Sequence, residues 1–346
     1  MRVIDVLTYP YVIARTRAIA GNLLKIEDYH ALLGCSKPVH VIDVLTRTGY
    51  RQDLKAGPSR LDLSSVRQII LDSFVSNLEH MISSTPKSAV PLLLAHRELL
   101  ESWSLVNALR ASLFQGNFIT ESQIIPCGLV EKSFYETLSG DPVKIFGLIS
   151  RREAFRGAAI QVKSAIETKS VAPLFGMLRH PLDKCSEAIL LLPSSEREVG
   201  RKLLYLHGDL GNIFILYDCV RRQVEPKDVS SWLLKKTYGL PKDVLDRSIS
   251  CRNLDQLNRL LESTEFGRYL SDIRSNGPTD EFLEKLKLDA LRDKSRLALA
   301  GYPFRAATIM AASNLKLIEV ANIMLCLTVV EGRTSAENVS KFIVVP

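Results

Sequence analysis

Apolar side chains recur along most of this chain with the three- and four-residue spacing of an amphipathic helix. Leu99, Trp103, Val106, Leu109 and Leu113 follow this spacing within one segment. Strict alternation of apolar and polar residues, the pattern of a half-buried strand, is hard to find over five or more positions. Because residues i, i+3, i+4 and i+7 share one face of a helix, we predict an all-α protein.

Prolines and small polar residues indicate where the helices begin, since proline fits the first turn of a helix and cannot continue a preceding one. Helix starts are predicted at Pro10, Pro91, Ser194 and Pro303. Turns are predicted at Gly21, at Gly116, at Glu225-Pro226 and at Gly332. Loops are predicted at residues 55–60 and 275–279.

A helix-turn-helix pattern occurs three times. Asn107, Asn212 and Asn322 each lie in the middle of a helical run, and a β-branched residue follows each of them after seventeen positions, at Ile124, Val229 and Val339. Residues 11–29 are similar to a fourth, more diverged copy. An asparagine inside a helix lowers helix propensity, so its recurrence predicts a repeated buried hydrogen bond, with contact to a partner as the alternative.

A second element follows the first one and supports an internal repeat. Thr48, Tyr50 and Leu54 recur at identical spacing as Thr264, Phe266 and Leu270, and residues 143–155 form a weaker middle version. Helices are predicted after these elements at 61–82, 158–168 and 281–299. We therefore predict three helical repeats of about 105 residues, at 1–90, 91–192 and 193–301, and a closing helix pair at 302–346.

Composition places the chain among ordinary globular proteins. Of its 346 residues, 46% are hydrophobic and 24% are charged, which excludes disordered and collagen-like classes. The net charge of +7 is mild for this length. This charge raises the alternative of a nucleic-acid binder, but there is no run of five basic residues and no interleaving of basic and aromatic residues. We predict that no nucleic acid is bound.

Cysteine and histidine spacing predicts no metal site. The six cysteines form no C-x-x-C pair, and no two of the six histidines lie three or four positions apart. The longest apolar stretch, residues 318–330, contains Glu319 and Asn322, and Asp5 and Arg15 interrupt any signal-peptide core. We expect a soluble protein that meets a membrane only through a partner.

The search for catalytic motifs yields one candidate. Phosphate-binding loops, dinucleotide fingerprints, zinc-protease helices and nucleophile elbows are all absent. The segment from His207 to Asn212, H-G-D-L-G-N, resembles the catalytic loop of small-molecule phosphotransferases, in which an Asp is the base and an Asn holds Mg²⁺. Asn212 follows Asp209 by three positions, whereas such loops need about five. A structural role for Asp209 is therefore favoured over a phosphotransferase, and we predict no catalytic, cofactor-binding or metal-binding residues.

Taken in order, several segments resemble the C subunit of the archaeal A-type ATP synthase, whose family includes the d subunit of the vacuolar ATPase. The resemblance rests on Tyr9-Pro10-Tyr11 with Ala14-Arg15, on Thr48-x-Tyr50, on Trp103 with Asn107 and Arg110, on Asp209 with Asn212, and on Glu319 with Asn322.

The resemblance implies a funnel of three similar helical bundles around a pseudo-threefold axis. It implies a non-catalytic central-stalk subunit of a proton- or sodium-translocating ATP synthase or ATPase. Such a protein links the central stalk to the membrane rotor ring and transmits torque, as a peripheral protein on the cytoplasmic face of the membrane. The inner surface of the funnel would then contact the stalk, and its wide base the ring. The alternative to this function is a generic helical scaffold that binds other proteins.

Overall fold

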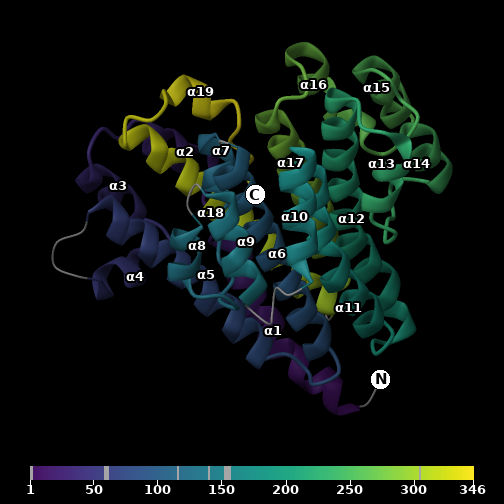
Figure 1. The fold of residues 1–346 in the computed structure, drawn as a ribbon. Helices are drawn as coiled ribbons and strands as arrows, with labels where there is room; N and C mark the ends of the chain where they lie inside the picture. Colours follow the sequence, from purple (N-terminus) through teal and green to yellow (C-terminus); the bar gives the residue numbers. More distant parts are fainter. Residues whose placement is uncertain (1–2, 58–61, 115–116, 139–140, 152–156, 304) are drawn as a thin grey trace.

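The computed structural model describes residues 3–57, 62–114, 117–138, 141–151, 157–303 and 305–346. Over these ranges the regular secondary structure is helical and contains no strand, which confirms the predicted all-α class (Figure 1). The first half of the chain forms α1 (Val3–Gly21), α2 (Ile26–Leu33), α3 (Pro38–Leu45), α4 (Arg51–Ala56), α5 (Leu63–Ser83), α6 (Val90–Phe114), α7 (Phe118–Ser122), α8 (Lys132–Thr137), α9 (Pro142–Arg151) and α10 (Ala158–Thr168). The second half forms the 3₁₀ helix η2 (Ala172–Leu178), α11 (Arg179–Ile189), α12 (Ser194–Arg222), α13 (Pro226–Trp232), α14 (Lys242–Ser248), α15 (Leu254–Glu262), the 3₁₀ helix η3 (Gly267–Tyr269), α16 (Ser271–Asn276), α17 (Asp280–Ala300), α18 (Ala306–Val330) and α19 (Ala336–Ser340).

Most predicted helix boundaries agree with the structure. α12 begins at Ser194, Pro91 is the second residue of α6, and α1 ends at Gly21. α13 begins at Pro226. Gly332 follows α18 with φ of 72°, a left-handed conformation that glycine adopts without steric cost. The three helices predicted at 61–82, 158–168 and 281–299 correspond to α5, α10 and α17.

The predicted start at Pro10 is wrong, because Pro10 lies inside α1. Proline removes one hydrogen bond from a helix, but its φ is compatible with helical backbone. The burial of its neighbours Tyr9, Val12 and Ile13 compensates for that loss.

Three other boundaries differ from the predictions. α18 begins at Ala306, three residues after the predicted start at Pro303. Helices extend into the first residues of both predicted loops, 55–60 and 275–279, since α4 continues to Ala56 and α16 to Asn276, and residues 58–60 lie outside the described residues. The turn predicted at Gly116 lies outside the described residues.

The second repeated element has the same local geometry in its first and last copies. The hydroxyl of Thr48 donates to the carbonyl of Leu45 at 2.7 Å, and that of Thr264 donates to the carbonyl of Leu261 at 2.6 Å. Each threonine oxygen also accepts the backbone N–H two residues later, and the aromatic side chains at these positions, Tyr50 and Phe266, are buried. The spacing therefore marks a real structural repeat at these two sites.

Helix α18 lies at the centre of the protein. It contacts α1, α2, α5, α6, α7, α12, α17 and α19. By length and composition α18 is apolar enough to cross a membrane, although the apolar stretch seen in the sequence, residues 318–330, is too short to do so. In the structure, 83% of the most apolar window of α18 is buried inside the protein. The helix is thus the core around which the others pack.

The long helices run between a narrow end and a wide end (Figure 1). The N-terminus lies at the narrow end, where α11 also reaches. At the wide end the short helices form two groups, α2, α3 and α19 on one side and α13 to α16 on the other. One continuous apolar core includes residues from Tyr9 to Val344. The two groups of short helices therefore pack on the same core.

Candidate functional site

Two of the repeated asparagines clamp a downstream backbone segment in the same way. Asn212 donates from Nδ2 to the carbonyl of Leu234 at 3.0 Å, and its Oδ1 accepts the N–H of Leu234 at 2.7 Å. Asn322 makes the same pair of contacts with Val344, at 2.7 and 3.3 Å. Both partners lie 22 residues downstream. The predicted buried hydrogen bond is confirmed, and its partner is the protein's own backbone.

The first asparagine of the series differs. Asn107 donates to the carbonyl of Gln123 at 3.1 Å, but its Oδ1 accepts from Arg110 rather than from the clamped segment. The following helix is capped by Asn117, ten residues after Asn107, whereas the corresponding interval is thirteen residues in the other two copies. This shorter turn leaves Ile124 beyond the end of α7.

Asp209 holds the same loop that Asn212 clamps. It is completely buried, and its two oxygens accept the backbone N–H groups of Tyr238, Gly239 and Leu240 at 2.8 to 3.1 Å. Burial raises the pKa of Asp209 to about 7, because desolvation outweighs the three backbone donors that lower it. The carboxylate is therefore occupied by loop backbone, which leaves no room for a substrate hydroxyl.

Two glycines complete this docking surface on α12. A Cβ at Gly208 would lie 1.9 Å from the carbonyl oxygen of Lys236, and a Cβ at Gly211 would lie 2.7 Å from Cδ1 of Leu234. At Gly208 the obstacle is backbone, so only glycine lets the loop approach the helix this closely there. The H-G-D-L-G-N segment thus packs a loop against a helix, and the geometry gives no support to the phosphotransferase alternative.

Buried carboxylates on α6 and α18 act similarly. Glu101 accepts the backbone N–H groups of Cys127 and Leu129 at 2.8 and 3.1 Å. Glu319 accepts the backbone N–H of Leu24 at 2.5 Å. Helices α6, α12 and α18 therefore each carry an acidic side chain that fixes a distant loop, and no cluster of metal-ligating side chains occurs among the described residues.

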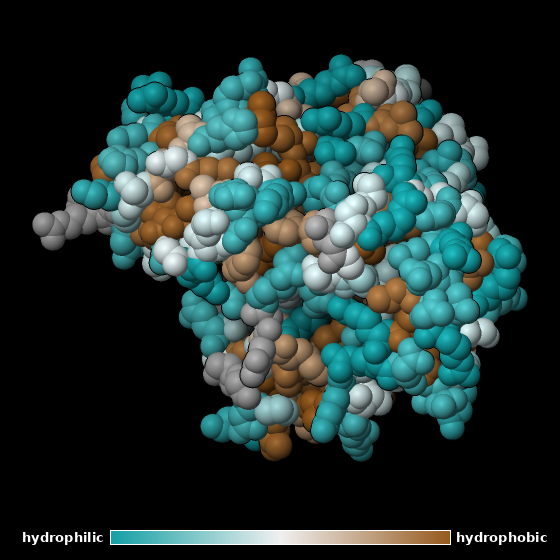
Figure 2. Space-filling view, turned by 90° about the horizontal axis from the view of Figure 1, so that it is seen from above, coloured by the Kyte–Doolittle hydropathy of each residue, from teal (hydrophilic) through white to brown (hydrophobic). Residues whose placement is uncertain are grey.

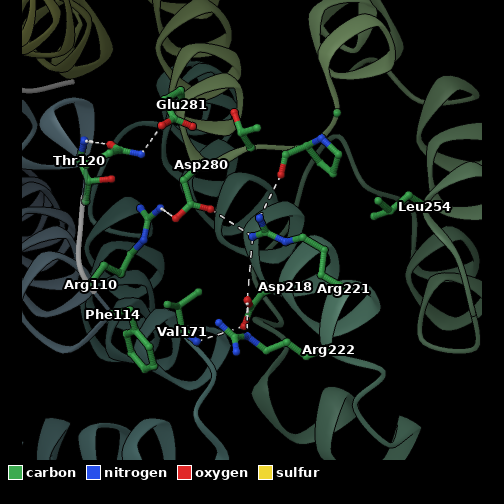
Figure 3. Close-up of a pocket in the computed structure, with 14 residues that line it drawn as sticks. Arg110, Phe114, Thr120, Val171, Asp218, Arg221, Arg222, Leu254, Asp280 and Glu281 are labelled. Carbon is green, nitrogen blue, oxygen red and sulfur yellow. Dashed lines mark hydrogen bonds and ion pairs between the residues drawn. The ribbon is translucent and has the colours of Figure 1, made fainter. Parts of the chain in front are cut away.

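A pocket of about 540 Å³ opens where α6 and α12 end and α17 begins, at the wide end of the protein (Figure 3). Its lining combines charged, polar and apolar side chains: Arg110, Phe114, Asn117, Thr120, Val171, Asp218, Arg221, Arg222, Leu254, Gly277, Pro278, Thr279, Asp280 and Glu281. Three arginines and three carboxylates in this set balance in charge.

Helix ends explain the order of these charges. Arg221 and Arg222 occupy the last turn of α12, and Asp280 and Glu281 occupy the first turn of α17. Cations are favoured at a helix C-terminus and anions at an N-terminus. Opposite charges are thus brought together where the two helices meet.

Asp280 is held between arginines from two different helices (Figure 3). Its Oδ2 lies 3.0 Å from Nη2 of Arg110 on α6, and its Oδ1 lies 3.1 Å from Nη2 of Arg221 on α12. Burial would raise the pKa of Asp280, but the two guanidinium groups outweigh burial and lower it. This ionic clamp joins α6, α12 and α17 at the rim of the pocket.

Arg110 and Asp218 anchor the clamp in the core. Arg110 is 2% exposed, also pairs with Glu284, and stacks over the ring of Phe214 with 5.0 Å between guanidinium carbon and ring centroid. Asp218 accepts from Nε of Arg222 at 2.8 Å and from the hydroxyl of Ser170 at 2.6 Å. The walls of the pocket are therefore fixed by buried charged groups.

This pocket is not evident from the sequence. Arg110 is named there only through the family resemblance, and Arg221 has no role. The one sequence signal for this pocket is the pair Arg221-Arg222, which ends a helical run just before Glu225-Pro226. Basic residues at this position are typical of a helix C-terminus. The opposing carboxylates lie about sixty residues away, so their proximity depends on the fold.

Comparison with known proteins identifies related chains. The model of a protein family described as the ATP synthase (C/AC39) subunit matches residues 12–342. The C subunit of the A-type ATP synthase of Archaeoglobus fulgidus is 20% identical over 333 residues, which cover 91% of this chain and 90% of that protein.

Proposed function

Because the chain belongs to the ATP synthase (C/AC39) subunit family, we propose that it is a non-catalytic central-stalk subunit of an A/V-type ATP synthase or ATPase. In this role it links the central stalk to the membrane rotor ring and transmits torque between them. The observation that carries the proposal is the extent of the family match, residues 12–342, which includes nearly every element of the fold. The similarity to the C subunit of an A-type ATP synthase over 91% of the chain supports it.

A torque-transmitting protein must be stiff, and the packing supports stiffness. Protein interiors are close-packed and transmit strain. Here one apolar core joins all the long helices, and buried side chains such as Asp209, Asn212 and Glu319 fix the connecting loops to them. The loops thereby move with the helices to which they are bound.

The repeat supports a division into units at 1–90, 91–192 and 193–301 with a closing pair at 302–346, arranged about a pseudo-threefold axis. The paired backbone contacts of Asn212 and Asn322 and the matching turns at Thr48 and Thr264 favour this arrangement. A body built from related units suits a part that rests on a ring of identical subunits.

The two ends differ in a way that suits two partners. The wide end carries the charged pocket, and its surface mixes hydrophilic and hydrophobic residues (Figure 2). At the narrow end, which α11 reaches, the connection after α11 exposes two adjacent large apolar side chains, Leu190 and Leu191. We propose that the stalk contacts the wide end and the ring the narrow end, the reverse of the wide-base ring contact that the family resemblance implies. The proposal includes a peripheral position on the cytoplasmic face of the membrane, as the family resemblance implies.

The test compares complexes reconstituted with and without this chain. We expect the soluble catalytic head to hydrolyse ATP without it, while ion transport by the membrane complex is lost. The isolated chain should show no magnesium-dependent ATP turnover. If hydrolysis by the isolated head collapses when the chain is absent, the chain contributes to catalysis and the proposal is wrong.

A further inference from the structure

The carboxylates that line the pocket at the wide end already have partners. Asp280 pairs with Arg110 and Arg221, and the side-chain amide of Asn117 donates to Glu281 at 2.6 Å. Asp218 accepts the hydroxyl of Ser170 and backbone N–H groups in addition to its contact with Arg222. These carboxylates are therefore occupied by contacts within the protein. A ligand must make its polar contacts with other groups that line the pocket.

Arg222 retains the capacity to bind a ligand. An arginine has five N–H donors, and Arg222 uses Nε for Asp218 at 2.8 Å. Its two terminal nitrogens make no hydrogen bond within the part of the chain that the structure describes, and its side chain is 40% exposed. Because the contact with Asp218 fixes one edge of the guanidinium group, the other edge is presented in a defined orientation. That edge fits a carboxylate, which arginine binds with two parallel hydrogen bonds.

The rest of the lining indicates what carries this carboxylate. Phe114 and Leu254 are half-buried apolar walls of the same pocket. A volume of about 540 Å³ lies within the range of ligand pockets, roughly 300–1,000 Å³. The lining charges balance, so a free polyanion would face three carboxylates as well as three arginines. A polyanion would be repelled by the three carboxylates. A single carboxylate can contact Arg222 while the apolar side chains on either side of it pack against Phe114 and Leu254.

We propose that this pocket receives an acidic side chain, flanked by apolar residues, from the central stalk, and that Arg222 binds its carboxylate. The inference rests on the proposed function and adds to it the chemistry of the partner and the residue that recognises it. Because α6, α12 and α17 meet at the pocket, the stalk would engage three helices of the core through one contact.

The experiment measures the affinity of the full chain for the purified central-stalk subunits of the same complex by calorimetry. Arg222→Gln removes the charge but keeps the length of the side chain. We expect its Kd to rise by about ten- to a hundredfold, the effect of losing one charge-assisted contact. The matched control is Arg247→Gln, since Arg247 also pairs with an aspartate four residues earlier, Asp243, but lies on α14 away from the pocket. The control should bind as the wild type does.

A second variant covers the case in which Arg222→Gln fails to fold. Arg222→Lys keeps a cation beside Asp218 but lacks the second hydrogen-bonding edge, so we expect several-fold weaker binding. Wild-type affinity in both Arg222 variants would overturn the proposal while leaving the proposed function intact. Failure of the wild-type chain to bind the stalk would overturn both. Inorganic phosphate is the third probe, and binding of phosphate that depends on Arg222 without any change in stalk affinity would identify a small-anion site and overturn the inference.

Discussion

The phenolic hydroxyl of Tyr50 donates a 2.8 Å hydrogen bond to Oε1 of Glu319, a residue 269 positions further along the chain. Both side chains are buried, and the ammonium group of Lys316 lies 4.1 Å from the centroid of the Tyr50 ring. The same carboxylate accepts the N–H of Leu24. Helix α18 therefore fixes the turn before α4 and the connection before α2 through one buried acid.

Removing the tyrosine hydroxyl tests this link. Tyr50→Phe keeps the ring but leaves Glu319 without one of its donors. We expect the free energy of unfolding to fall by about 1–2 kcal/mol, measured by urea denaturation, since a buried acceptor loses a partner. Tyr11→Phe is the control because Tyr11 is 65% exposed, and it should change stability little. Equal stability of the two variants would show that the contact between Tyr50 and Glu319 contributes nothing to the fold.

A glycine in α12 gives a prediction whose sign is unusual. Alanine is favoured over glycine inside a helix by about 1 kcal/mol. Gly208→Ala should nevertheless destabilise the protein, because its Cβ would lie 1.9 Å from the carbonyl oxygen of Lys236. Gly147→Ala, in α9, meets nothing within 4 Å and should stabilise or leave stability unchanged. Thermal unfolding of the two variants measures the contrast, and a stabilising Gly208→Ala would contradict the close packing of the loop on α12.

The buried Asp209 predicts a pH dependence of stability. Its pKa in the folded protein is raised to about 7, above the value of about 3.9 expected in the unfolded chain. The folded state thus holds a proton that the unfolded state releases. The stability from this group is fully present below about pH 4 and is lost as the pH rises towards 7.

Urea unfolding at pH 5 and pH 8 measures this effect. Between pH 5 and pH 8, the free energy of unfolding of the wild type should fall by about 2 kcal/mol more than that of Asp209→Asn, because the asparagine does not titrate. Asp243→Asn is the control, since the side chain of Asp243 is 73% exposed, and its profile should follow that of the wild type. Parallel profiles for wild type and Asp209→Asn would mean that Asp209 has an ordinary pKa.

Extraction of native membranes tests the peripheral association. Since 83% of the apolar window of α18 is buried inside the protein, that helix is not free to enter a bilayer. We expect alkaline carbonate to release the chain without detergent, while the rotor-ring subunits remain in the pellet as an internal control. Retention of the chain in the alkali-washed pellet would show that α18 or another segment is inserted.

Much of the fold could be predicted from periodicity and repeats. Asn212 and Asn322 stand out in the sequence because a mid-helix asparagine is costly, and the structure shows the buried backbone contacts that compensate for this cost. Pro10 could not be placed correctly, because local preference is overridden by the burial of its neighbours. The extent of α18 could not be predicted for a related reason, since a central helix tolerates buried polar residues such as Glu319 when distant partners satisfy them.

The pocket could not be predicted in the same way. Arg110, Arg221 and Asp280 belong to three helices, and nothing local in any of them indicates that two arginines share one carboxylate. Asp209 shows the opposite case. The H-G-D-L-G-N motif suggests that Asp209 is catalytic. Its hydrogen bonds to backbone N–H groups some thirty residues away show that it holds a loop instead.

The central position of α18 has a consequence for how the chain is made. A ribosome adds about 5–20 residues per second, so α1 and α2 emerge well before the helix that covers them, which begins almost 300 residues later. During translation the nascent chain therefore exposes surfaces whose partner does not yet exist. When α18 does emerge, it carries a stretch that has the length and composition of a membrane span. Biosynthesis must then favour docking of this helix into the helices already made over its insertion into a membrane.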